Sequence, residues 1–84
     1  MSAPRFVQSA RRLDAERERD LRRGEFLRAL DESDYTVTDW EAQFIESFLN
    51  FTSTRPGDAA RWWTPGRRTS CDRMMSHYAA LANR

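Results

Sequence analysis

The fold of this chain is decided by residues 38–51, TDWEAQFIESFLNF. Thr38 is followed three residues later by Glu41, which is the spacing of a capping box that starts a helix. Aromatic and aliphatic side chains then recur at helical intervals from Trp40 to Phe51. The sequence therefore predicts a central helix over residues 39–50.

A last helix is predicted nearer the C-terminus. Thr64 and Pro65 provide an N-cap and a proline at the first helical position. Between the two helices, Asn50 to Trp63 contains Pro56-Gly57 and is expected to form a loop of about a dozen residues. The final helix is expected over residues 65–82, with one apolar stripe made of Cys71, Met74, Met75, Tyr78 and Leu81.

The N-terminal part is dense in charge. Residues 9–23 hold good helix formers and no helix breaker, but the apolar stripe is thin, so we expect a solvated helical arm. Gly24 is expected to break this pattern, and a short core helix is expected over residues 25–31. Oppositely charged residues at helical spacing should support the arm: Arg12–Glu16, Glu18–Arg22, Asp14–Arg17, Glu16–Arg19 and Asp20–Arg23.

These elements predict an all-α protein, a small three-helix domain with an N-terminal charged helical arm. The arm comprises residues 1–23 and the compact helical domain residues 24–84. We expect its core to contain Leu21, Phe26, Leu27, Leu30, Trp40, Phe44, Ile45, Phe48, Cys71, Met74, Met75 and Tyr78.

Composition limits the class of protein. The 84 residues are 39% hydrophobic and 32% charged, which suits a small polar domain. No apolar run approaches the ~20 residues that cross a bilayer, and the N-terminus lacks the apolar segment of a secretory signal, so we expect a cytoplasmic location and no membrane. The net charge of +1 is unevenly distributed, because residues 31–50 contain six acids and no arginine.

The sequence predicts no catalytic site, metal site or cofactor. The chain has one cysteine and one histidine, which rules out a disulfide framework and a conventional zinc site. Cys71 and His77 are six residues apart and would lie on different faces of a helix. Cys71 also belongs to an apolar stripe, where a buried and inert thiol is usual.

The candidate binding residues begin with an adjacent pair of tryptophans. Trp62 and Trp63 either fold to opposite sides of the chain or leave one ring exposed as an interface anchor beside Arg61. The alternative is that one ring covers an end of the core and the other stacks on Arg61 or Arg55, and this alternative is favoured.

Two arginines, Arg67 and Arg68, stand in the first turn of the last helix, where the helix dipole disfavours positive charge. They are expected either to pair with Asp39, Glu41 or Glu46 of the central helix, which is favoured, or to hold an anion with Arg61. The acidic segment is by default a solvated face, and its alternative role is to imitate nucleic-acid charge in the basic groove of a partner.

The chain also resembles a group of proteins through its capping and core motifs. The motifs are Glu25-Phe26-Leu27, Thr38-Asp39-Trp40-Glu41 with Phe44-Ile45-Glu46-Ser47, and Trp63-Thr64-Pro65. Over residues 21–80 it is similar to short helical bacteriophage and prophage proteins, most of them uncharacterised. Gly66-Arg67-Arg68 departs from the glutamine-containing turn that often follows Thr-Pro in them. The resemblance implies a protein that adjusts a host machine.

The leading hypothesis is therefore a non-enzymatic interaction module, a phage-encoded modulator or inhibitor of a host protein complex such as a defence or nucleic-acid-processing machine. The second hypothesis is an accessory nucleic-acid-binding protein that uses the arginine and tryptophan patch. A homodimer completed by the arm is a third. The residues expected to contact a partner are Arg61, Trp62, Trp63, Arg67, Arg68, Asp39, Glu41 and Glu46.

Overall fold

The computed structural model describes the backbone of residues 3–83 and the side chains of residues 12–83. Within residues 3–83 every regular element is a helix, which confirms the all-α class. The elements are α1 (Ala3–Glu32), α2 (Asp39–Thr54), the 3-10 helix η1 (Pro56–Trp62), α3 (Pro65–His77) and the short α4 (Ala79–Ala82).

Helix α1 runs without interruption through Gly24, so the break expected there is wrong. The short helix expected over residues 25–31 is the last part of α1. A Cβ atom at position 24 would lie 3.0 Å from Cζ of Phe48. The glycine therefore allows α2 to approach α1 closely, and the helix tolerates it at a cost of about 1 kcal/mol.

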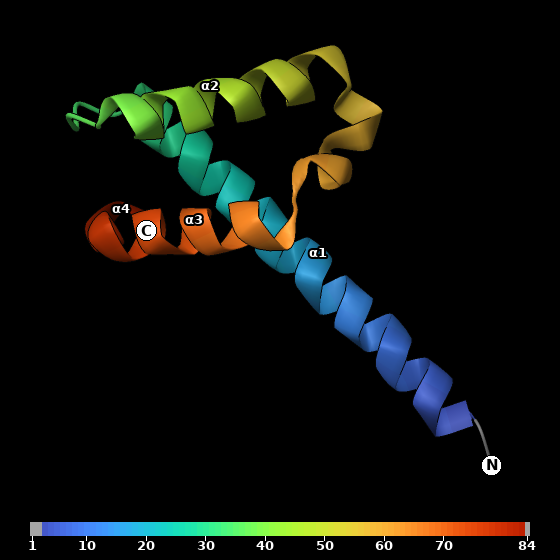
Figure 1. Cartoon of the computed structure of the whole chain (residues 1–84). Coiled ribbons are helices and arrows are strands. Elements are labelled where there is room, and N and C mark those ends of the chain that lie inside the picture. The colour runs from blue at the N-terminus through green and yellow to red at the C-terminus, as the bar shows by residue number, and fades with distance from the viewer. Residues whose placement is uncertain (1–2, 84) are drawn as a thin grey trace.

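The N-terminal part of α1 projects from the other helices (Figure 1), and with it the described structure is 53 Å long. The predicted arm and the predicted compact domain thus share one helix. Among the side chains from Arg12 onward, only one of the five expected intrahelical pairs lies within ion-pair distance, Asp20–Arg23 at 2.8 Å. The arm is therefore held less by its own ion pairs than the sequence suggested.

Helix α2 begins at the predicted capping box. The Thr38 hydroxyl accepts a hydrogen bond from the Glu41 N–H at 3.1 Å, and the Glu41 carboxylate accepts one from the Thr38 N–H at 2.8 Å. The helix continues to Thr54, and η1 follows it, so the expected loop between Asn50 and Trp63 is wrong. Pro56 ends the run because a proline cannot continue a helix ladder.

The last helix also begins where the sequence predicts, with the Thr64 hydroxyl accepting from the Arg67 N–H at 3.2 Å. The segment expected to be one helix over residues 65–82 is bent at Tyr78, whose φ and ψ are −106° and 47°. Helix α4 follows the bend. Figure 1 shows α2 and α3 on the same side of α1, with η1 connecting them.

The core lies where α1, α2, η1 and α3 meet. The prediction that Leu21 and Trp40 lie in the core is wrong, because their side chains are 68% and 54% exposed. Phe44 and Met75 are only partly buried against the core. Trp62 and Trp63 are buried instead. The buried set is Phe26, Leu27, Leu30, Ile45, Phe48, Trp62, Trp63, Cys71, Met74 and Tyr78.

Candidate interaction surface

The two adjacent tryptophans both lie in the core. Trp62 ends η1 and Trp63 is extended, and this change of backbone direction lets both rings turn inward. They contact each other edge to face, with centroids 5.0 Å apart, and both pack on the ring of Phe48. Neither ring is free to act as an exposed anchor in this structure.

Arg67 lies against the Trp62 side chain rather than beside an anion. Its guanidinium is 4.6 Å from the centre of the Trp62 ring, and it donates a hydrogen bond to the Trp62 carbonyl at 2.7 Å. The prediction that one of the two tryptophans stacks on Arg55 or Arg61 is therefore wrong. Arg55 instead lies over Phe51 at 5.3 Å, and Arg61 is exposed, 3.7 Å from Asp58.

Arg68 pairs with a residue that the sequence did not indicate as its partner. Its guanidinium donates two hydrogen bonds of 3.0 Å to the carboxylate of Asp20 in α1. Arg67 and Arg68 form no ion pair with Asp39, Glu41 or Glu46 among the side chains that the structure describes, so that expectation is wrong. Arg61, Arg67 and Arg68 have different neighbours and do not converge on one site.

Glu41 has a structural role. Besides closing the capping box, its carboxylate accepts a hydrogen bond of 2.9 Å from the Tyr78 hydroxyl. Burial acts to raise the pKa of Glu41, but the hydrogen bonds from Thr38 and Tyr78 outweigh burial and lower the pKa below its ordinary value. Glu41 thus links the start of α2 to the end of α3. Asp39 and Glu46 are exposed on α2.

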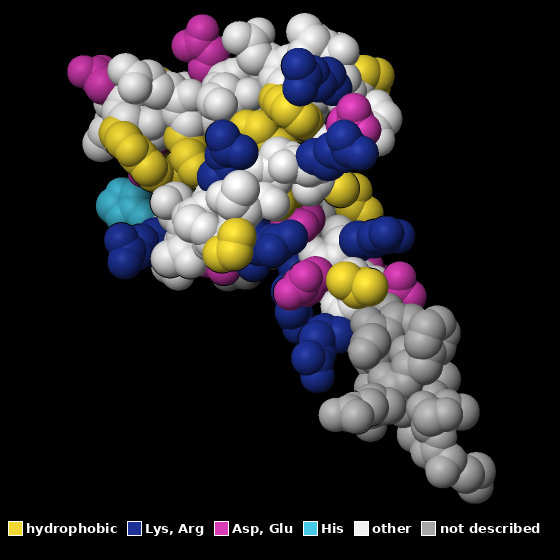
Figure 2. All heavy atoms as spheres, turned by 45° about the vertical axis from the view of Figure 1, so that its right-hand side comes forward, with side chains coloured by type: hydrophobic (Ala, Val, Ile, Leu, Met, Phe, Trp, Pro, Cys, Tyr) yellow, Lys and Arg dark blue, Asp and Glu magenta, His cyan; other side chains and the backbone are white. Residues whose placement is uncertain are grey.

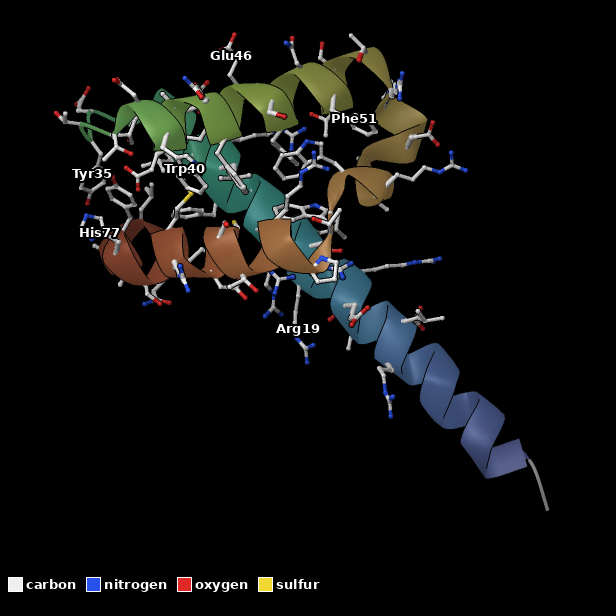
Figure 3. The ribbon with its side chains drawn as sticks, in the orientation of Figure 1. Arg19, Tyr35, Trp40, Glu46, Phe51 and His77 are labelled. Carbon is white, nitrogen blue, oxygen red and sulfur yellow. The ribbon has the colours of Figure 1, made fainter. Side chains whose placement is uncertain are left out.

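One side of α2 carries a row of partly exposed aromatic residues, Trp40, Phe44 and Phe51, which we call the α2 aromatic face. The Trp40 ring stacks on Phe44 with centroids 5.4 Å apart, and Phe44 packs edge to face on the buried Trp62 at 5.1 Å. Trp40 is therefore held by a ring that is itself anchored in the core. Figure 3 shows Trp40 and Phe51 on the side of α2 nearer α3, and Glu46 on the opposite side.

Positive charges border the α2 aromatic face, and negative charges lie on the other side of α2. Arg55 and Arg67 contact its rings or the ring beneath it, while Asp39 and Glu46 lie roughly 100–160° around α2 from the three aromatic residues. Figure 2 shows hydrophobic side chains interleaved with arginines on one side of the body and acidic side chains at its upper edge. This mixture of a large aromatic side chain and flanking charges is typical of protein interfaces.

Sequence reasoning missed Trp40 as a surface residue, although a signal was present. The residues of α2 that are buried, Ile45, Phe48 and Thr52, recur at intervals of three and four. Trp40 lies roughly 80–140° away from their positions around the helix. The apolar positions of α2 thus cover more of the helix surface than one packing face requires.

The side chains of Cys71 and His77, which the sequence offered as candidates for chemistry, both pack against other groups. Cys71 is buried, and burial raises the pKa of its thiol to about 12. Its sulfur lies 4.0 Å from the Arg23 carbonyl, and His77 packs against the Tyr78 ring at 4.6 Å. Among residues 12–83 no group of three histidine, cysteine or acidic side chains could hold a metal ion.

Two further findings concern the chain as a whole. Over the described residues, no helix combines the length and the apolar character needed to cross a membrane. No known protein family, no curated protein and no solved structure matches the chain.

Proposed function

We propose that this protein is a non-enzymatic interaction module that binds another protein through the α2 aromatic face. The observation that carries the proposal is Trp40, a tryptophan that is 54% exposed and is stacked on an anchored phenylalanine. An exposed tryptophan gives a large contact area on binding, and tryptophan is among the residues most often responsible for binding energy.

The way in which Trp40 is held also supports the proposal. A side chain that is already fixed by Phe44 loses little conformational entropy when a partner covers it. Phe44 in turn contacts the buried Trp62, so the geometry of the face is set by the core. The face is thus prepared for binding before a partner arrives.

The finer proposal concerns the partner. Asp39 and Glu46, which are exposed on the other side of α2, favour a partner that covers the aromatic face with an apolar pocket and reaches around the helix with basic groups. Complexes that bind nucleic acid, including defence complexes of that kind, carry basic groups for its phosphates. Together with the resemblance of the sequence to small phage proteins, this supports a phage-encoded modulator or inhibitor of a host complex in the bacterial cytoplasm.

The alternative function, binding of nucleic acid by the arginine and tryptophan patch, receives less support. Stacking of bases needs exposed rings, and Trp62 and Trp63 are buried. Arg67 and Arg68 are engaged by the Trp62 carbonyl and by Asp20. Nuclease treatment during affinity capture separates binding of protein from binding of nucleic acid.

The test is affinity capture from bacterial lysate with the whole chain and two variants. Trp40→Ala removes the anchor, and Arg22→Ala, on the exposed side of α1, is the control. We expect a defined protein to be retained by the unsubstituted chain and by Arg22→Ala, to be lost with Trp40→Ala, and to survive nuclease treatment.

Two other results would contradict the proposal. Retention that disappears after nuclease treatment and falls steeply with salt would indicate that the protein binds nucleic acid and not another protein. Retention that is equal for Trp40→Ala and the unsubstituted chain would show that the α2 aromatic face is not the binding surface.

A further inference from the structure

An apolar groove lies at the base of the projecting part of α1, between α1, α2 and η1. It has a volume of about 220 Å³. Its floor consists of the rings of Phe48 and Trp63, which are 2% and 7% exposed. Its apolar walls are Leu21, Ala59 and Ala60. Leu21 is 68% exposed, so the groove presents an apolar wall to solvent.

A basic residue stands at each end of this groove. Arg17 and Arg28 both line it, and both are exposed. They lie on the same face of α1, because the eleven residues from one to the other correspond to about three turns. Their Cα atoms are roughly 16 Å apart along the helix axis, at 1.5 Å per residue. Leu21 lies between them on this face.

The guanidinium of Arg28 lies toward the groove rather than toward the acids of its own helix. It is 5.1 Å from the centre of the Phe48 ring, and it donates a long hydrogen bond of 3.5 Å to the Thr52 hydroxyl. Glu25 and Glu32 are three and four residues away on α1, yet neither lies within ion-pair distance of Arg28. A guanidinium has five N–H donors, so Arg28 retains donors for a further acceptor.

Arg17 has no acidic partner among the described side chains. The pair Asp14–Arg17 expected from the sequence does not form. The part of the chain that precedes the described side chains contains no acidic residue. Asp20 is the acid that lines the groove, and it already binds Arg23 and Arg68. The lining therefore carries an excess of positive charge.

We propose that the groove binds an acidic segment of a partner protein, in which one aromatic or branched aliphatic side chain is flanked by acidic residues. The apolar side chain enters the groove, and the carboxylates pair with Arg17 and Arg28. The inference does not rest on the proposed function, because the groove shares no residue with the α2 aromatic face. It assigns a second binding surface to the chain.

The size of the groove favours a single side chain. An apolar cavity of about 150 Å³ accommodates one benzene molecule. Sites for drug-sized molecules are larger, roughly 300–1,000 Å³. A groove of about 220 Å³ therefore has room for one large apolar side chain, and its walls provide apolar surface for that side chain to cover.

The separation of the two arginines favours a peptide segment over a small molecule. An extended chain advances about 3.4 Å per residue, so about five residues span the distance between the Cα atoms of Arg17 and Arg28. Acidic residues two or three positions on either side of the apolar residue would then lie near both guanidinium groups. A molecule small enough to fit inside the groove could not reach both ends.

Titration of the ¹⁵N-labelled whole chain with a synthetic peptide, followed by NMR, tests the proposal. The probe is the capped peptide Glu-Glu-Ala-Phe-Ala-Glu-Glu, at up to 3 mM in 50 mM salt. We expect the amide signals of Ala59, Ala60 and Trp63 to shift. The Kd should be on the order of hundreds of micromolar, because one apolar side chain and exposed ion pairs form the contact. Alanine in place of the phenylalanine of the peptide should weaken binding roughly tenfold.

Substitutions in the chain separate the groove from charge elsewhere. Arg17→Gln and Arg28→Gln should each raise the Kd about threefold, as expected for exposed ion pairs. Ala60→Leu keeps the charge but fills part of the groove, so it should weaken binding more than either arginine substitution. Arg19→Gln is the matched control. It removes an equal charge on the opposite side of α1, where Figure 3 shows Arg19 pointing away from α2, and should leave the Kd unchanged.

Each of four results would overturn the proposal. Unshifted signals of Ala59 and Ala60 at 3 mM peptide, or equal weakening by Arg19→Gln and Arg28→Gln, would show that the groove is not the site. Equal binding of a peptide with lysines in place of the glutamates would exclude an acidic partner. A single-stranded oligonucleotide that shifts the same signals more strongly than the peptide would assign the arginines to nucleic acid. Trp40→Ala should bind the peptide normally, which distinguishes failure of this site from failure of the α2 aromatic face.

Discussion

The guanidinium of Arg23 in α1 donates hydrogen bonds to both carboxylate oxygens of Asp72 in α3, at 2.8 and 3.0 Å. The same guanidinium donates to Asp20, which also accepts two hydrogen bonds from Arg68. The hydrogen bonds with Asp72 and Asp20 raise the pKa of Arg23, and those with Asp20 raise the pKa of Arg68. These four side chains fasten the base of the arm to α3.

Asp20 is the centre of this network, because it is only 7% exposed and binds two arginines. Asp20→Asn removes the charge that both guanidinium groups face. We expect the free energy of unfolding to fall by about 2 kcal/mol, less than for a fully buried pair since Arg68 is partly exposed. Urea unfolding followed by circular dichroism measures this loss.

The control for Asp20→Asn is Asp72→Asn. Asp72 is 54% exposed as a side chain, so its pair with Arg23 is weakened by solvent. We expect a change below about 1 kcal/mol. Equal losses for the two substitutions would contradict a central role for Asp20.

Cys71 should be inert in the folded protein. Its thiol is 0% exposed, and burial raises its pKa to about 12, so at pH 8 only about one thiol in ten thousand is ionised. We expect a thiol reagent such as dithionitrobenzoate to react slowly with the native chain and at once in 6 M guanidinium. Rapid reaction without denaturant would place Cys71 outside the core.

Local signals in the sequence predicted the starts of α2 and α3, whereas the features that the sequence did not predict depend on contacts between distant residues. The capping box at Thr38 involves residues three apart, so its pattern alone locates the start of α2. Gly24 resembled a helix break because the reason for it, the approach of Phe48, arises only in the folded chain. The partner of Arg68 is 48 residues away in the sequence.

The candidate site was less predictable than the fold. Asp39 and Glu46 lie on the surface as expected, but Trp62 and Trp63 are buried, and Trp40 is exposed in their place. The apolar pattern identifies which residues are large and hydrophobic. It does not say which of them the small core leaves uncovered, since that depends on how η1 folds back over α2.

The ionisation of Glu41 should make the stability of the protein depend on pH. Hydrogen bonds to its carboxylate lower its pKa in the folded state below the ordinary value of 4.5. Its contribution is therefore complete above about pH 4.5 and is lost as the pH falls through the lowered pKa. Glu41→Gln retains a side chain that can close the capping box but has no charge to titrate.

We expect Glu41→Gln to be less stable than the unsubstituted chain at pH 7 and to approach it in stability below pH 4.5. Thermal unfolding at pH 7, 5, 4 and 3 measures the difference. Glu46→Gln, at an exposed position of the same helix, is the control and should follow the unsubstituted chain. A constant difference between Glu41→Gln and the unsubstituted chain at all four pH values would argue against the acid dependence.

The same substitution at two glycines should have opposite effects. Alanine is preferred to glycine within helices by about 1 kcal/mol. At Gly66, in the first turn of α3, a new Cβ would meet no atom within 4 Å. We expect Gly66→Ala to stabilise the protein by up to about 1 kcal/mol.

At Gly24 the new Cβ would lie 3.0 Å from Phe48, whose ring is also fixed by Trp62, Trp63 and the guanidinium of Arg28. Because this ring has little room to move, crowding should cost 1–3 kcal/mol, roughly, and exceed the gain in helix propensity. We expect Gly24→Ala to lower the unfolding free energy by about 1 kcal/mol. Urea unfolding of both variants measures whether each substitution raises or lowers the free energy of unfolding. Stabilisation by Gly24→Ala would mean that α1 and α2 separate easily and that Gly24 does not determine their approach.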